Sequence, residues 1–157
     1  MGLFDNNDWE KLSDLKRRKL ITNNENQKKA ELEEQYLRAL IHIVRRCAKQ
    51  FADDAIKLGL RPPKRKMFYY AWRISLRVIR DEFSEKPDMI SGTFYVDKKG
   101  NLRIMKYNDY REMSDDDILE QVSEKQHHGS GYICIATEIE IVNSFKDSLT
   151  SYALDSF

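Results

Sequence analysis

The chain of 157 residues is 41% hydrophobic, 34% charged and 11% aromatic, with a formal net charge of +1, which is ordinary for a globular protein that buries a core. It contains nothing near the roughly 18 consecutive apolar residues that a membrane-spanning helix needs. The first residues lack the pattern of a signal peptide or of N-terminal acylation, and the two cysteines lie within apolar patterns. We therefore predict a cytoplasmic protein without a membrane segment. We expect a single domain over residues 1–157, with loose ends at 1–7 and 152–157.

The first predicted element is a short helix over residues 8–20, and the run Lys16–Lys19 in its last turn complements the helix dipole. A second, longer helix begins at the capping box Thr22–Glu25, in which the threonine and the glutamate each satisfy a free backbone N–H. This helix ends where Gly59 supplies a left-handed residue and Pro62–Pro63 prevents its resumption.

Apolar residues recur along the second helix at steps of three and four, which indicates one buried stripe. A continuous helix over residues 23–58 is about 54 Å long, whereas a compact domain of this size is only about 40 Å across. We therefore expect residues 32–58 to pack against the body. The polar leading turns would overhang the body or pair with a second subunit. The predicted stripe comprises Leu32, Tyr36, Leu40, Ile43, Cys47, Phe51, Ala55 and Leu58.

Residues 64–83 fit two geometries. As a strand, the apolar side chains of residues 70–78 alternate with polar or small ones. If the segment is a helix, its apolar residues from Phe68 to Phe83 form a stripe on the side opposite its arginines. Enrichment in β-branched and aromatic residues favours the strand. In both geometries a spacing of four places Arg73 and Arg77 on the same side.

The clearest hairpin consists of residues 93–96 and 102–105 around the turn Asp97–Asn101, after a loop bracketed by Pro87 and Gly92. Further along, Ser114 caps a predicted helix over 114–126, and three aspartates fill its first turn.

Residues 133–141 alternate as a strand that places four isoleucines on one face, and a short helix follows from residue 144. These elements predict an α+β fold. A short N-terminal helix and a long amphipathic helix would pack on a small antiparallel sheet of three to four strands, with further helices near the C-terminus.

Charge is strongly segregated along the chain. Residues 38–80 carry 12 Lys and Arg against two Asp, a net charge of +10. Residues 81–157 carry 8 basic and 16 acidic side chains, a net charge of −8. Such segregation concerns partners and self-association rather than the fold.

The basic middle of the chain is the main candidate for a binding surface. Cations neutralise phosphates, and exposed aromatic rings stack on unpaired bases, so the combination is typical of nucleic-acid binding. The alternative is a solvated helix face with aromatic residues buried in the core. The candidate anion-binding or nucleic-acid-binding residues are Arg38, His42, Arg45, Lys49, Lys64, Arg65, Lys66, Tyr69, Tyr70, Arg73 and Arg77.

Other chemistry has less support. Asp115–Asp117 with His127 and His128 provide suitable metal ligands, but their spacing matches no standard site. Cys47 and His42 point about 140° apart around one helix, which excludes a thiolate–imidazole pair within that helix. No Gly-x-Ser-x-Gly elbow, Walker loop or dinucleotide fingerprint is present. We therefore predict no metal, no cofactor and no catalytic residues.

These observations favour a small non-enzymatic interaction protein that forms a homodimer. It would dock an anionic partner, nucleic acid or an acidic protein, through residues 38–80. A first alternative is self-assembly of the basic middle of one subunit against the acidic C-terminal half of another. A second alternative is an enzyme with an unrecognised site near Asp115–His128.

Overall fold

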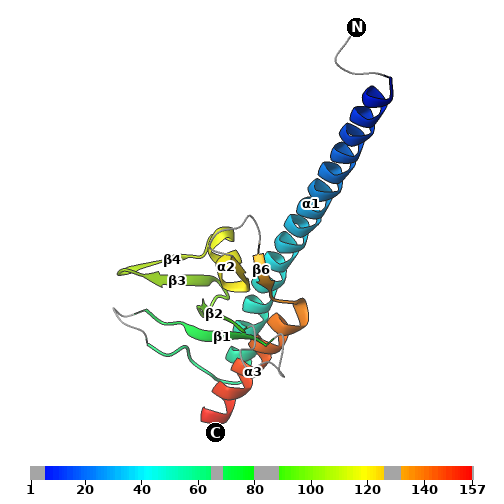
Figure 1. Ribbon diagram of the computed structural model, residues 1–157. Coiled ribbons are helices and arrows are strands. Elements are labelled where there is room, and N and C mark those ends of the chain that lie inside the picture. Colours follow the sequence, from blue (N-terminus) through cyan, green and yellow to red (C-terminus); the bar gives the residue numbers. More distant parts are fainter. Residues whose placement is uncertain (1–5, 65–68, 80–88, 126–131, 157) are drawn as a thin grey trace. The chain divides into compact units, whose positions relative to one another are not determined.

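The computed structural model describes residues 6–64, 69–79, 89–125 and 132–156, which form three helices and six strands (Figure 1). The strands β1 to β4 form one antiparallel sheet in that order, and β5 pairs with β6. This architecture confirms the predicted α+β class. The elements are α1 (Asn6–Lys57), β1 (Trp72–Ile79), β2 (Met89–Val96), β3 (Leu102–Lys106), β4 (Asp109–Glu112), α2 (Asp115–Val122), β5 (Ser123–Lys125), β6 (Tyr132–Ile135) and α3 (Glu138–Ser156).

The chain divides into two compact parts, an N-terminal segment (Met1–Arg38) and a C-terminal unit (Ala39–Phe157). The described residues of the N-terminal segment are entirely helical, whereas the C-terminal unit contains both sheets. No helix in the described part of the chain has the length and apolarity needed to cross a bilayer.

The two predicted N-terminal helices are one continuous helix, so the predicted break near residue 21 is wrong. Thr22 does not cap a helix: its hydroxyl donates to the carbonyl oxygen of Arg18, one turn back, at 3.0 Å. No glycine or proline lies between Leu3 and Leu58. The polar Thr-Asn-Asn run costs only a few tenths of a kcal/mol per residue, which is too little to interrupt a helix.

The buried stripe of α1 is rotated relative to the predicted one. Leu32 and Tyr36 are 65% and 42% exposed, and only Leu40, Phe51 and Ala55 of the predicted set are buried. The sequence has apolar residues at adjacent positions and therefore offers two overlapping stripes. The observed stripe contains more alanines, which allow closer packing. The buried residues of α1 are Leu37, Leu40, Ile41, Val44, Ala48, Phe51, Ala52 and Ala55.

The predicted end of this helix is confirmed. Gly59 has a φ of +77°, and its N–H donates to the carbonyl oxygen of Ile56. The N–H of Leu60 donates to the carbonyl oxygen of Ala55, which completes a Schellman motif.

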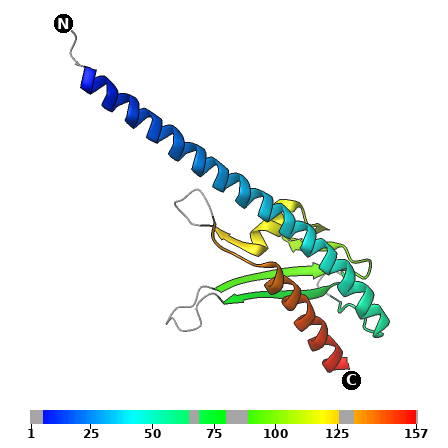
Figure 2. The same cartoon turned by 90° about the vertical axis from the view of Figure 1, so that its right-hand side faces the viewer.

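Residues 72–79 form the strand β1, so the structure confirms the strand geometry for this part of 64–83. Trp72, Ile74, Leu76 and Val78 are fully buried. The Trp72 ring meets Phe51 of α1 edge to face, with 5.5 Å between ring centroids. From α3, Phe145 stacks on Phe94 of β2. The C-terminal part of α1 and the helix α3 thus cover the same face of the β1–β2 pair (Figure 2).

The hairpin of β2 and β3 is confirmed, but Gly92 lies inside β2 rather than in a loop. A Cβ atom at Gly92 would lie 2.2 Å from the carbonyl oxygen of Gln121. The Gln121 side chain also accepts a hydrogen bond from the Thr93 N–H at 2.8 Å. This glycine therefore allows α2 to pack closely against the strand, a tertiary requirement with no local sequence signal.

The helix predicted from Ser114 is confirmed as α2, with a capping box between Ser114 and Asp117. It ends at Val122 rather than at residue 126 because Ser123–Lys125 pair with β6. The second half of the strand predicted over 133–141 is wrong, since α3 begins at Glu138. At this helix start the Thr137 N–H and hydroxyl donate to the Glu140 carboxylate, and the Glu140 N–H donates to the Thr137 hydroxyl oxygen, a capping arrangement.

Candidate anion-binding surface

The turn between β2 and β3 is organised by the carboxylate of Asp97. Its Oδ1 accepts hydrogen bonds from the backbone N–H groups of Lys99 and Asn101, both at 2.9 Å. Its Oδ2 accepts from Arg103 Nε at 3.2 Å. The side chain of Asp97 is only 14% exposed. This carboxylate therefore fixes the turn, and it holds Lys98 and Lys99 at an exposed tip.

The same turn lies directly against α1. Gly100 has a φ of +85°, and a Cβ atom there would lie 2.7 Å from the Cα atom of Lys49. Only glycine allows this approach without a shift of one backbone. Lys49, on the exposed side of α1, is thereby brought beside Lys99, and both line a pocket of about 210 Å³.

A larger pocket of about 510 Å³ adjoins the first and shares Lys99 with it. It is formed by the segment after α1, by Tyr70 and by the β2–β3 turn. Its lining residues are Arg61, Pro62, Tyr70, Asp97, Lys98, Lys99 and Arg103. We call the cations Lys49, Arg61, Lys98, Lys99 and Arg103, together with Tyr70, the basic turn surface.

The charges of this surface are largely uncompensated. Arg103 pairs with Asp97, as described above. Lys49, Arg61, Lys98 and Lys99 form no ion pair with any residue that the structure describes. Glu112 also lines the smaller pocket. Four cations from three separate chain segments therefore surround two adjoining pockets.

The two neighbouring tyrosines have different environments. Tyr69 stacks on Tyr110 of β4, with 4.1 Å between ring centroids and 13° between planes. The Arg103 guanidinium lies 5.2 Å from the centre of the Tyr110 ring. Burial raises the pKa of Tyr110, although the positive charge of Arg103 opposes the shift. Tyr70, by contrast, is 54% exposed at the larger pocket.

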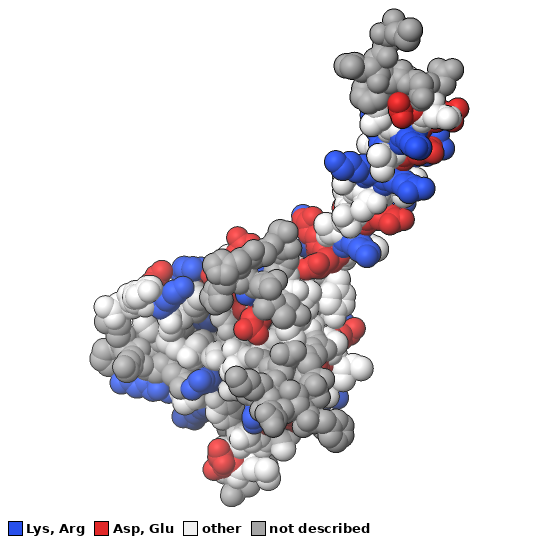
Figure 3. Space-filling view, viewed as in Figure 1, with Lys and Arg blue, Asp and Glu red and all other residues white. Residues whose placement is uncertain are grey.

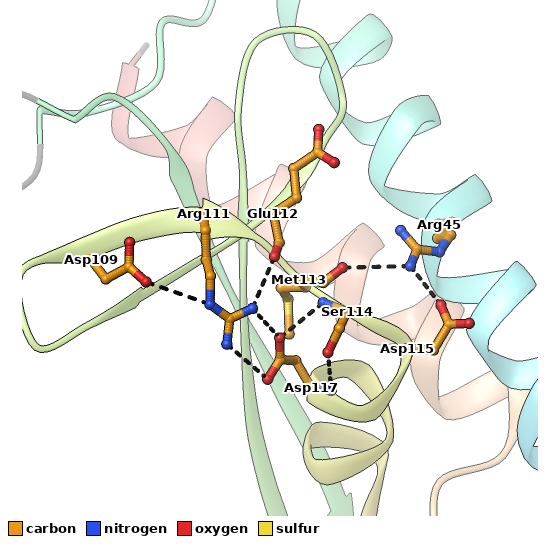
Figure 4. A network of polar contacts seen from close by, with 8 residues as sticks. All are labelled: Arg45, Asp109, Arg111, Glu112, Met113, Ser114, Asp115 and Asp117. Atoms are coloured by element: carbon orange, nitrogen blue, oxygen red, sulfur yellow. Dashed lines mark hydrogen bonds and ion pairs between the residues drawn. The ribbon is translucent and has the colours of Figure 1, made fainter.

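Several predicted site residues are neutralised within the chain. Arg38 pairs with Glu34, one turn earlier on the helix, at 2.7 Å. Arg45 lines the smaller pocket, but its guanidinium donates to Asp115 at 2.7 Å (Figure 4). Its neighbour Arg46 pairs with Glu138. The basic middle and the acidic C-terminal half thus partly compensate each other inside one molecule.

The remaining predicted residues are dispersed. Arg73 and Arg77 line a different pocket of about 590 Å³, between β1 and α3, together with Glu140 and Asp147. His42 lies on the exposed side of α1. Lys64 is exposed and its backbone forms a bridge with Tyr70. Arg65 and Lys66 lie outside the described residues.

On the face shown in Figure 3, the Lys and Arg side chains of the C-terminal unit that are drawn in colour form several separate groups. The structure therefore brings Lys49 and Tyr70 together with Arg61, Lys98, Lys99 and Arg103, but it separates them from Arg73 and Arg77. The two lysines of the turn were missed because in the sequence they belong to the acidic half. Two adjacent lysines at the tip of a predicted hairpin, next to a glycine that could pack against a helix, are the sequence feature that could have indicated them.

Asp115 and Asp117 at the start of α2 both have partners within the chain (Figure 4). Asp117 accepts hydrogen bonds from the Arg111 guanidinium of β4 and from the Ser114 N–H, and these lower its pKa from 3.8 to about 2, with Arg111 the larger cause. No group of three potential ligands poised for a metal ion occurs among the described residues. His127 and His128 lie outside them, so the predicted alternative of a catalytic site in this region stays a prediction.

No known protein family matches the chain, and neither a characterised protein nor a solved structure is similar to it.

Proposed function

We propose that this protein is a non-enzymatic interaction protein that docks an anionic partner through the basic turn surface. The observation that carries the proposal is the cluster of Lys49, Arg61, Lys98 and Lys99, which lack ion-pair partners among the described residues. Cations held together by a folded scaffold attract an anion more strongly than the same cations dispersed over a surface.

The mechanism is electrostatic docking on a preformed surface. Asp97 and Gly100 hold the turn against α1, so the partner does not have to order the turn when it binds. When the cations bind a polyanion they displace the small counterions condensed on it, and binding therefore weakens steeply as salt rises. With four contacts to a duplex, affinity is expected to fall about 100-fold between about 50 and about 200 mM salt.

Anisotropy of fluorescein-labelled heparin, titrated with the full chain at several salt concentrations, tests this proposal. The double variant Lys98→Gln/Lys99→Gln is expected to lose at least about tenfold in affinity and roughly half of the salt dependence. The matched control is Lys28→Gln/Lys29→Gln, which removes two adjacent exposed lysines from the N-terminal segment. Equal affinities for the two double variants, or no binding at low salt, would reject the proposal.

A location in the cytoplasm is part of the proposal. Cys47 and Cys134, both within the described residues, are not joined in a disulfide. Unbridged cysteines are usual in proteins of reducing compartments, which supports this location.

Self-assembly is a second candidate, and the N-terminal segment supports it. Leu12, Leu15 and Leu32 are exposed on this helix. In an antiparallel pair of these helices that cross near residue 25, the cations Lys16–Lys19 of one copy would lie beside the acidic residues of 31–34 of the other. The basic middle is less available for this role because Arg45 and Arg46 pair within the chain. Light scattering across a salt series tests self-assembly, and a monomer at every ionic strength rejects it.

A further inference from the structure

We infer that the anionic partner is a single-stranded nucleic acid, with the phosphates held by the cations of the basic turn surface and a base stacked on Tyr70. This inference rests on the proposed function. It adds the chemical class of the partner and assigns a distinct role to one aromatic side chain.

The first support is the placement of Tyr70. Tyr70 is 54% exposed and borders the 510 Å³ pocket together with Arg61, Lys98 and Lys99. The backbone on both sides of it is held, because Tyr70 forms a β-bridge with Lys64 and the Ala71 N–H donates to the carbonyl oxygen of Pro63 at 3.3 Å. A ring that is exposed but held in place loses little conformational entropy when a base stacks on it.

The contrast with Tyr69 sharpens this assignment. Tyr69 already stacks on Tyr110 and is half-buried, so its ring belongs to the internal packing. Tyr70, the next residue in an extended segment, points to the opposite side, toward the cations. Of the two tyrosines, only Tyr70 therefore combines an available ring face with neighbouring uncompensated charge.

The second support is the shape and chemistry of the surface. A stacking partner must offer an open base face, which a duplex does not, because its bases are already stacked and paired. An acidic protein would use the cations but would leave the tyrosine ring without a matching group. A single strand supplies both phosphates and exposed bases, and its flexible backbone follows a concave surface.

The test compares four fluorescein-labelled probes by anisotropy: oligothymidylate of about 12 nucleotides, a duplex of the same length, heparin and an oligoglutamate peptide. The full chain is expected to bind the single strand more tightly than the duplex and the peptide. The variant Tyr70→Leu is expected to bind oligothymidylate about tenfold more weakly, while its affinity for heparin stays unchanged. Tyr70→Trp, which keeps an aromatic face, is expected to retain the affinity.

The matched control is Tyr107→Leu, which removes a tyrosine that is 92% exposed between β3 and β4. It is expected to leave all four affinities unchanged. The inference is overturned if Tyr70→Leu binds oligothymidylate as tightly as the wild type does, or if single strand and duplex bind with equal affinity. In either case, binding of heparin would still support the proposed function. Tighter binding of oligoglutamate identifies an acidic protein as the partner and also overturns the inference. Failure to bind any probe rejects both proposals.

Discussion

Two groups of cations in the C-terminal unit have opposite environments. Arg45, Arg46 and Arg111 each lie within reach of a carboxylate at or near the start of α2 or α3. Lys49 and Lys98, by contrast, have no such partner among the described residues. The first group consists of arginines and the second of lysines, and the arginines are paired because the starts of α2 and α3 place acidic residues beside them. The first group is neutralised within the chain, whereas the second carries the charge on which the proposed anion binding rests.

The largest effect is expected where the basic turn surface is joined to α1. Gly100→Ala places a methyl group 2.7 Å from the Lys49 Cα atom at a positive φ, so the turn must move. We expect a loss of about 2–4 kcal/mol in the free energy of unfolding, together with weaker heparin binding. Chemical denaturation and anisotropy measure the two effects.

Gly59→Ala is the control for this substitution. Gly59 also has a positive φ, but its Cβ atom would meet nothing within 4 Å. The expected cost is only the left-handed strain of about 1–2 kcal/mol, with unchanged heparin binding. Equal effects of the two substitutions would show that the contact between the turn and α1 is unimportant.

The next largest effect concerns the carboxylate beneath the exposed lysines. Asp97→Ala leaves the N–H groups of Lys99 and Asn101 without their acceptor. We expect a loss of about 2–3 kcal/mol in stability and a less ordered tip. Although the substitution makes the surface more positive, we expect heparin binding to weaken, as measured by anisotropy. Tighter binding would mean that net charge rather than geometry controls the interaction.

For the paired group, Asp117 is the most informative position. Asp117→Ala removes the capping box of α2 and the partner of Arg111, so we expect a loss of about 1–2 kcal/mol in thermal or chemical denaturation. Heparin binding is expected to stay unchanged. If Asp117→Ala changed the affinity for heparin but not the stability, the distinction between the paired arginines and the unpaired lysines would be contradicted.

The pH dependence of the same group has a definite sign. The pKa of Asp117 is about 2 in the folded protein and 3.8 without its partners, so the unfolded state binds its proton more readily. Its stabilising contribution is complete above about pH 4 and is lost as the pH falls toward 2. Acid denaturation curves of the wild type and Asp117→Ala should therefore converge over this range. Curves that remain parallel would contradict the lowered pKa.

The smallest effect is expected for Arg45→Gln. Its pair with Asp115 is largely exposed, so the loss in stability is at most about 0.5 kcal/mol. Heparin affinity should change much less than in Lys98→Gln/Lys99→Gln, because this arginine is already paired. An equal loss of affinity would place Arg45 in the binding surface.

The sequence by itself determined the features that depend on neighbouring residues. The end of α1 at Gly59, the β2–β3 hairpin and the cap of α2 all follow from local backbone and side-chain chemistry. Each of these features depends on residues only a few positions apart, so it can be predicted without knowledge of the rest of the fold. The alternation within residues 70–78 favours a strand but leaves a helix open, and only the structure decides between the two.

Only the tertiary structure decided the other features. The buried stripe of α1 depends on which of two overlapping faces packs against the sheet, and Gly92 is explained only by the carbonyl of Gln121 across the interface. The pairing of a cation depends on where distant carboxylates come to lie: Arg45 meets Asp115, whereas Lys49, four residues later, meets the glycine of a turn. Sequence separation contains no information about such contacts, because they are set by the packing of whole elements.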